Sequence, residues 1–96
     1  MTKKHARLHA LIYGRVQGVN FRYYTQKQAV ALKVTGWVAN RPDRGVEVVA
    51  EGKKETLQKL LAFLHRGPPS ARVDRVQAGW TEATGEFNRF RVRYLT

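Results

Sequence analysis

The hydrophobic period of this chain changes from two residues to about 3.6 and back, twice, within 96 residues. Apolar and polar residues alternate over 6–13, which predicts a half-buried strand, and a loop over 14–20 follows it. Helical spacing over 21–33 and again over 53–66 predicts two helices. The apolar face of the second helix consists of Leu57, Leu60, Leu61 and Leu64. A glycine and two prolines follow at 67–69 and end that helix, because proline cannot continue one.

Segments rich in β-branched and aromatic residues predict three more strands, at 34–39, 46–50 and 73–81, and a last strand at 87–94. The turn at 40–45 makes the first two of these a hairpin. The order is therefore βαββαβ plus a short C-terminal strand. It predicts an α+β fold, the ferredoxin-like split β-α-β sandwich, in which two helices cover one face of an antiparallel sheet. Residues 1–96 contain no linker or internal repeat, so we expect a single domain.

Composition excludes several classes of chemistry. The chain has no cysteine, so it has no disulfide, no thiolate nucleophile and no cysteine-based metal site. No apolar run approaches the ~18 residues of a membrane span, and we expect a cytoplasmic protein. The net charge is +11, and no acid occurs before Asp43. A positive first half attracts anions, so the partner is a small phosphorylated molecule or a nucleic acid, unless the charge reflects only genome composition and solubility.

The junction between the first strand and the first helix is the best candidate for an anion site. A glycine-flanked loop lies there, with Arg15 in the loop and Arg22 in the first helical turn. Such a junction directs backbone N–H groups and positive charge toward one point, which suits a phosphate group. The sequence does not decide the role of Arg15, which either adds positive charge to the loop or is an ordinary surface charge.

The run from Gly14 to Arg22, Gly-Arg-Val-Gln-Gly-Val-Asn-Phe-Arg, resembles the acylphosphatase signature. A second block is similar to the same family at the expected distance: Gly36-Trp37-Val38-Ala39-Asn40, then Asp43-Arg44-Gly45-Val46-Glu47 and Gly52. Similarity continues at Gly67-Pro68, at Val73-Asp74-Arg75-Val76 and in the region of Phe87 and Phe90, so it covers nearly the whole chain. Asn20 stands where many members have glycine, and Arg41 where some have threonine.

The resemblance implies an enzyme that hydrolyses the carboxyl–phosphate bond of acyl phosphates and releases inorganic phosphate. It assigns phosphate binding to Arg22 and orientation of the attacking water to Asn40. It assigns the phosphate loop to Arg15, Val16, Gln17, Gly18, Val19, Asn20 and Phe21. It implies no metal and no organic cofactor, and we expect a monomer with no membrane and no nucleic acid partner.

The chemistry of acyl phosphate hydrolysis is consistent with these residue roles. The leaving group is a carboxylate with a pKa near ~4, so it departs without being protonated. The reaction then needs a phosphoryl group held still and a water molecule placed in line with it. The guanidinium of Arg22 offers a bidentate fork, and the neutral amide of Asn40 can hydrogen-bond a water but cannot deprotonate it. We therefore hypothesise that a phosphoryl oxygen takes the proton.

Two other functions stay open at this point. An RNA-binding module can have the same fold, but the strand at 46–50 carries aliphatic residues with Glu47, and Glu51 follows it, so it offers no aromatic platform for bases. A non-catalytic anion-binding domain would not require the second block. His5 and His9 would lie roughly 13 Å apart along a strand, which is too far to share a metal ion. Ser70 has no evident histidine and aspartate partners.

The remaining expectations concern packing and the last strand. Five residues are expected in the core: Phe21, Trp37, Leu57, Leu61 and Leu64. Of the neighbours Tyr23 and Tyr24, one is expected to pack and the other to be partly exposed. Nothing in the sequence explains the cationic residues Arg89, Arg91 and Arg93, which are either a solvated strand face or a surface that steers anions.

Overall fold

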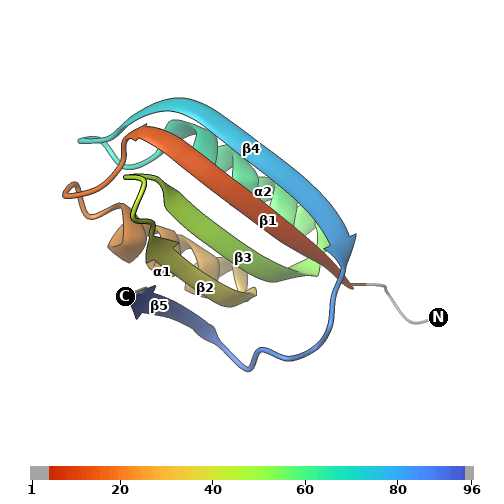
Figure 1. Ribbon diagram of the computed structural model, residues 1–96. Coiled ribbons are helices and arrows are strands. Elements are labelled where there is room, and N and C mark those ends of the chain that lie inside the picture. The colour runs from red at the N-terminus through yellow and green to blue at the C-terminus, as the bar shows by residue number, and fades with distance from the viewer. Residues whose placement is uncertain (1–4, 95–96) are drawn as a thin grey trace.

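The computed structural model describes residues 5–94 and has the expected order of elements. These are β1 (His5–Arg15), α1 (Phe21–Leu32), β2 (Thr35–Asn40), β3 (Val46–Lys53), α2 (Lys54–Arg66), β4 (Arg72–Glu82) and β5 (Phe90–Tyr94). The strands form one sheet in the order β4-β1-β3-β2-β5, and both helices cover the same face of it (Figure 1). The predicted α+β, ferredoxin-like arrangement is confirmed. We call the other face of the sheet the open face.

The fifth strand makes the sheet mixed. The pairs β1–β4, β1–β3 and β2–β3 are antiparallel, whereas β5 runs parallel to β2. The expected start of the last strand at 87 is wrong, because pairing with β2 begins at Phe90. The preceding segment is held elsewhere: the Glu51 carboxylate accepts hydrogen bonds from the backbone N–H groups of Thr84 at 2.9 Å and Gly85 at 3.0 Å. The first backbone contact of the following chain with β2 is at Arg89, whose carbonyl oxygen accepts a hydrogen bond from the N–H of Gly36 at 3.0 Å.

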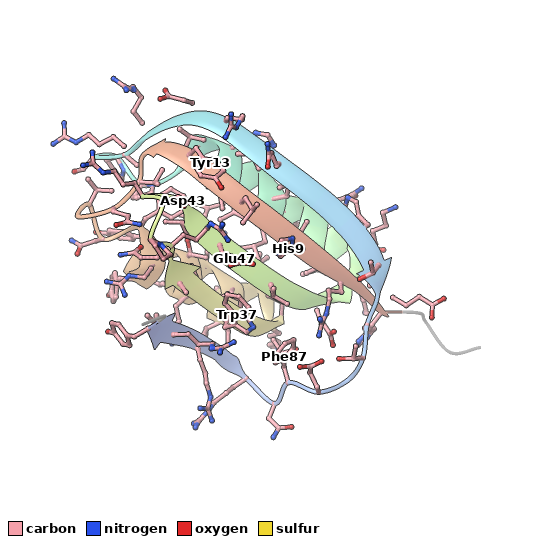
Figure 2. The ribbon with its side chains drawn as sticks, viewed as in Figure 1. His9, Tyr13, Trp37, Asp43, Glu47 and Phe87 are labelled. Carbon is pink, nitrogen blue, oxygen red and sulfur yellow. The ribbon has the colours of Figure 1, made fainter. Side chains whose placement is uncertain are left out.

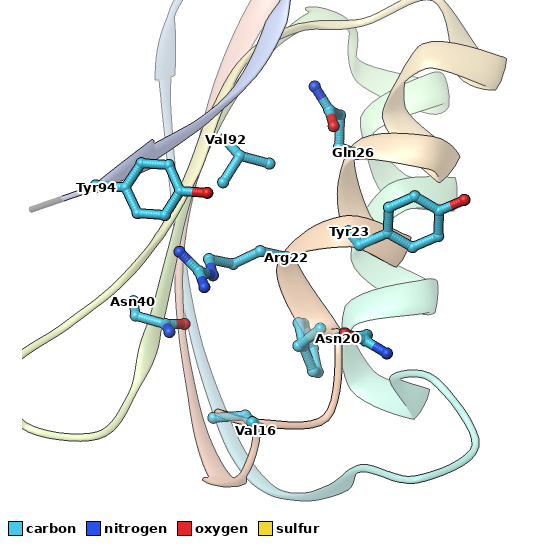
Figure 3. A pocket seen from close by; sticks show the side chains of 10 residues that line it. Val16, Asn20, Arg22, Tyr23, Gln26, Asn40, Val92 and Tyr94 are labelled. Carbon is cyan, nitrogen blue, oxygen red and sulfur yellow. The ribbon is translucent and has the colours of Figure 1, made fainter.

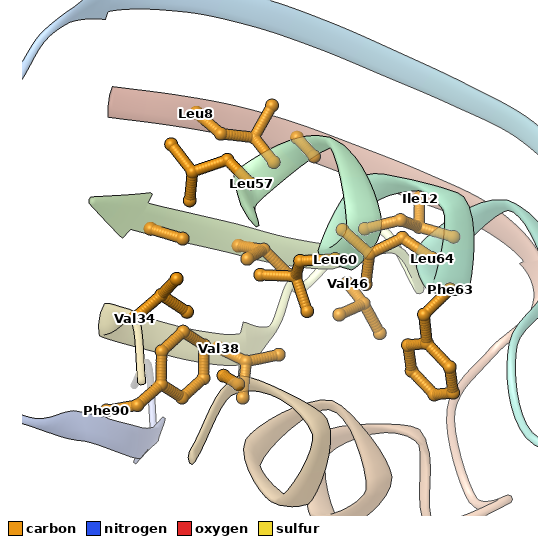
Figure 4. Packing of buried hydrophobic residues seen from close by; sticks show 14 of the residues in the cluster. Leu8, Ile12, Val34, Val38, Val46, Leu57, Leu60, Phe63, Leu64 and Phe90 are labelled. Carbon is orange, nitrogen blue, oxygen red and sulfur yellow. The ribbon is translucent and has the colours of Figure 1, made fainter. Parts of the chain in front are cut away.

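The core lies between the sheet and the two helices (Figure 4). Leu8 and Ile12 of β1 pack there with the leucines of α2, and burial of each such side chain contributes about 2 kcal/mol. The structure confirms Phe21, Leu57 and Leu64 as core residues, while Leu61 packs at the margin of the cluster.

Two expectations about aromatic residues are wrong. Trp37 is not in the core, because Val38 faces the helices and its neighbour in the strand must then face the open side. Tyr23 and Tyr24 are 56% and 38% exposed, so neither is buried in the core. Their rings instead contact each other edge to face, with centroids 5.1 Å apart.

Gly14 allows β1 to bend into the loop that follows it. Its φ is +133°, and the register between β1 and β4 shifts between Tyr13 and Gly14. A Cβ atom at this position would lie 2.2 Å from the carbonyl oxygen of Arg72, so only glycine fits. The bend carries the chain past the end of β1 and toward the start of α1.

Neither helix of the described chain is long and apolar enough to cross a membrane.

Candidate functional site

A cavity of about 380 Å³ opens where the loop after β1, the first turns of α1 and the ends of β2 and β5 meet. Figure 3 shows side chains from all four segments directed into it. The residues that line it are Val16, Gly18, Asn20, Phe21, Arg22, Tyr23, Gln26, Asn40, Val92 and Tyr94. None of them is acidic, so nothing in the lining repels an anion.

The loop delivers the N-terminus of α1 to this cavity. Asn20, just before the helix, has left-handed backbone angles with φ 62°, a conformation that asparagine tolerates better than most residues. Its carbonyl accepts the first helical hydrogen bond, from the N–H of Tyr24 at 3.1 Å, and no side chain caps the helix. The N–H groups before Tyr24 therefore have no helical partner, and the positive end of the helix dipole faces the cavity.

Arg22 and Asn40 meet across the cavity. Asn40 is the last residue of β2, and the guanidinium of Arg22 extends toward it from the first turn of α1 (Figure 3). The parallel pairing of β5 with β2 places Tyr94 opposite Asn40. The Arg22 guanidinium carbon lies 5.0 Å from the centre of the Tyr94 ring, a cation–π contact that orients the charged group. Arg22 forms no ion pair with any residue between 5 and 94.

Gln17 ties the loop to the turn after β2. Its Nε2 donates hydrogen bonds to the carbonyl oxygens of Arg41 at 2.9 Å and Gly45 at 2.8 Å. The side chain is thus used within the protein and does not line the cavity. Because Arg41 follows Asn40 directly, this tether fixes the relative position of the loop and Asn40.

The structure does not bring every residue of the expected loop to the cavity. Val16, Gly18, Asn20 and Phe21 line it together with Arg22 and Asn40, but Arg15, Gln17 and Val19 do not. Arg15 is an exposed residue at the end of β1, opposite Arg72 of β4. Val19 packs against the core.

Arg41 is occupied outside the cavity. Its guanidinium contacts Asp43 and Glu47, both at 3.1 Å, and these ion pairs, the hydrogen bond to Asp43 above all, raise the pKa of Arg41. The backbone N–H of Gly45 bonds the Asp43 carboxylate and, with Tyr13 and Arg41, lowers the pKa of Asp43. The charge of Arg41 is therefore paired with these two acids, and Arg41 is not part of the cavity lining.

Four residues of the cavity were missed by sequence reasoning: Tyr23, Gln26, Val92 and Tyr94. The alternating pattern of the last strand predicts that Val92 and Tyr94 share one face. It does not predict which strand the last strand pairs with. Gln26 links that strand to α1, since its Nε2 donates to the carbonyl oxygen of Phe90 at 3.1 Å. The wall of the cavity formed by β5 is thus held by a contact between β5 and α1.

Comparison with known proteins shows which family this chain is similar to. The acylphosphatase family model matches residues 8–92. The acylphosphatase of Pelotomaculum thermopropionicum is 48% identical over 93% of this chain and 97% of its own length. That of Thermococcus kodakarensis is 50% identical over 85% and 90%.

Solved structures agree. The crystal structure of acylphosphatase from Bacillus subtilis superposes with a TM-score of 0.89 at 35% identity, covering 93% of this chain and 99% of that one. An acylphosphatase from Coxiella burnetii superposes with a TM-score of 0.84 at 39% identity, over 97% and 100%. On the family model, these relatives and the fold, this chain belongs to the acylphosphatase family.

Proposed function

We propose that this protein hydrolyses acyl phosphates to a carboxylate and inorganic phosphate without a metal ion or organic cofactor. One observation carries the proposal: Arg22, the uncapped N-terminus of α1 and Asn40 meet in one cavity that contains no acid. Membership of the acylphosphatase family supports the same activity.

In the proposed reaction the phosphoryl group lies against the loop and the N-terminus of α1. Backbone N–H groups of the loop residues that line the cavity and of the first turn of α1, together with the fork of Arg22, hold its oxygens and stabilise the charge that spreads over them in the transition state. The acyl group extends toward Tyr23, Val92 and Tyr94, which line the cavity beside Arg22.

Asn40 positions the nucleophile, which is a water molecule. Its side-chain amide hydrogen-bonds a water molecule in line with the bond to be broken. The water oxygen forms the new bond to phosphorus, the bond between phosphorus and the acyl oxygen breaks, and its electron pair leaves with the carboxylate. The proton of the water passes to a phosphoryl oxygen, since the cavity lining holds no carboxylate or imidazole to receive it.

A non-catalytic anion-binding domain is the alternative. Such a domain would use Arg22 and the loop amides but would gain nothing from an asparagine placed across the cavity from the anion. The two functions therefore differ in what Asn40 does, and a kinetic experiment separates them.

Turnover of a small acyl phosphate, with chelator in excess, tests the proposal on wild type, Arg22→Lys and Asn40→Ala. Arg22→Lys loses the bidentate fork, so phosphate affinity and kcat both fall, kcat by about 100-fold. Asn40→Ala loses about 100-fold in kcat and keeps its affinity for inorganic phosphate. Asn88→Ala is the matched control, since Asn88 is exposed and lies outside the cavity.

Three results would contradict the proposal. A folded wild type that hydrolyses the substrate no faster than buffer would leave only anion binding. Equal loss of phosphate affinity and kcat in Asn40→Ala would refute the separate roles of Arg22 and Asn40. Near-normal activity of Arg22→Lys would refute the role of the bidentate Arg22 guanidinium in holding the phosphate.

The proposal extends to the state of the protein in the cell. We expect it to act as a monomer, and to act in the cytoplasm. Sedimentation at the concentrations used for kinetics tests the monomer, because a dimer that dissociates with loss of activity would contradict it.

A further inference from the structure

A second groove lies on the open face of the sheet, next to β5. It has a volume of about 250 Å³, and it is lined by Gly36, Trp37, Glu86, Phe87, Asn88, Arg89, Arg91 and Arg93. None of these residues lines the cavity that holds Arg22 and Asn40. Figure 2 shows Trp37 on β2 and Phe87 in the segment that leads into β5, both on the open face.

The pairing of β2 with β5 builds this groove. Trp37 is opposite Arg91 in the parallel register, and Arg93 follows on the same side of β5. The guanidinium carbon of Arg93 lies 4.7 Å from the centre of the Trp37 ring. On the other side, the guanidinium of Arg7 lies 5.2 Å from the centre of the Phe87 ring. Two aromatic rings therefore line the groove, each with a guanidinium against it, and of these two arginines Arg93 is itself part of the lining.

The groove has an excess of positive charge. Arg89, Arg91 and Arg93 form no ion pair within residues 5–94, whereas the one acid in the lining, Glu86, contacts Arg7 at 2.7 Å. That contact, after the hydrogen bond from Thr84, lowers the pKa of Glu86 and keeps it ionised and paired. Three arginines are left to bind an anion, and these are the residues that neither the core nor the proposed reaction uses.

We propose that this groove binds a nucleotide, with the base stacked against Trp37 and the Arg93 guanidinium and the phosphate held by Arg91 and Arg89. Aromatic rings and arginine planes are the surfaces on which proteins stack unpaired bases, and such stacking does not depend on base identity. A bare anion would need no aromatic ring, and an apolar ligand would not need three arginines. The shared chemistry is that of a nucleotide, either free or as a unit of a single strand.

This inference revises one expectation from the sequence. The strand at 46–50 offers no platform for bases, but the structure supplies rings from β2 and from the segment before β5 instead. The competing explanation is that the arginines only steer acyl phosphates toward the cavity. Steering changes kcat/KM with salt but does not produce a saturable complex at Trp37.

The indole N–H resonance of Trp37, followed by heteronuclear NMR, tests the proposal directly. Trp80, the other tryptophan, packs at the margin of the core, and a Trp80→Phe variant assigns the two signals. AMP, adenosine, ribose 5-phosphate and a tetranucleotide are titrated with inorganic phosphate in excess to fill the cavity of Arg22. The variant Arg91→Gln/Arg93→Gln is compared with Lys27→Gln/Lys59→Gln, which removes the same charge from exposed helical positions. Amide signals outside the groove check that each variant is folded.

We expect AMP to shift the Trp37 signal saturably, and adenosine and ribose 5-phosphate to bind at least about 10-fold more weakly because each lacks half of the ligand. The arginine double variant loses about 10-fold in affinity and the lysine control stays near wild type. Tighter binding of the tetranucleotide than of AMP identifies a single strand as the source, and equal binding identifies the free nucleotide. The proposal is wrong if neither AMP nor the tetranucleotide shifts the Trp37 signal, or if ribose 5-phosphate binds as well as AMP.

Discussion

Replacing Gln17 by alanine removes both hydrogen bonds between the phosphate loop and the turn after β2. Two such bonds contribute about 2 kcal/mol to the free energy of unfolding. Both acceptor carbonyls keep a backbone partner, because the N–H of Arg44 reaches the oxygen of Arg41 at 3.1 Å and the N–H of Arg41 reaches that of Gly45 at 2.8 Å. Neither carbonyl is left unsatisfied, so we expect a loss of about 1 to 2 kcal/mol rather than more.

The same change weakens the site, since an untethered loop must be ordered each time phosphate binds. If all of this cost appears in binding, the Kd for inorganic phosphate rises about 10-fold, because 1.4 kcal/mol corresponds to a factor of ten. Gln17→Glu keeps the size of the side chain but points carboxylate oxygens at two carbonyls. At neutral pH it is therefore at least as destabilised as Gln17→Ala.

Urea denaturation measures the first effect, and calorimetric titration with phosphate measures the second. Gln58→Ala is the control, because Gln58 is exposed on α2 and its side chain makes no hydrogen bond within the described chain. An unfolding free energy within about 0.5 kcal/mol of wild type, together with an unchanged phosphate Kd, would show that the loop needs no tether and would refute this reasoning.

Two further changes have defined outcomes. Tyr94→Leu removes the ring under Arg22, so kcat/KM falls about two- to five-fold while Tyr94→Phe keeps it; equal losses in both variants would contradict a role for the ring face. Glu51 is 4% exposed, and although burial opposes its ionisation, hydrogen bonds from Thr84 and Arg7 lower its pKa. Its contribution to stability is therefore complete above about pH 5 and is lost as the pH falls through the folded-state pKa. Glu51→Gln costs about 2 kcal/mol at pH 7, and an equally large difference at pH 3, measured by urea denaturation, would contradict this sign.

Local patterns explain why most of the fold was predictable. Strand alternation over 6–13, the leucine spacing of α2 and the proline-containing turn at 40–45 each act within a few residues, and each led to the observed element. The errors came from contacts between distant segments. The segment before β5 is held by Glu51, more than thirty residues earlier, and Trp37 faces the open side because of its register in the sheet.

The same division holds at the site. The junction at 14–22 and the position of Asn40 were visible in the sequence, and the structure brings Arg22 and Asn40 to one cavity. The resemblance assigned Gln17 to the phosphate loop, and no local signal shows that its side-chain amide turns back toward residues 41–45. Tyr94 was missed for a related reason: its place depends on the parallel pairing of β5 with β2.

The parallel docking of β5 against β2 has a consequence for how the protein gains its activity during refolding. Val92 and Tyr94 face Arg22 across the cavity from about 70 residues away along the chain, so the cavity forms only after one of the most distant contacts in the molecule has closed. Contacts of such long sequence separation carry a high entropic cost and tend to form late. The rate at which turnover returns after dilution from denaturant therefore reports the docking of β5. The far-ultraviolet circular dichroism signal of the helices should recover before turnover does.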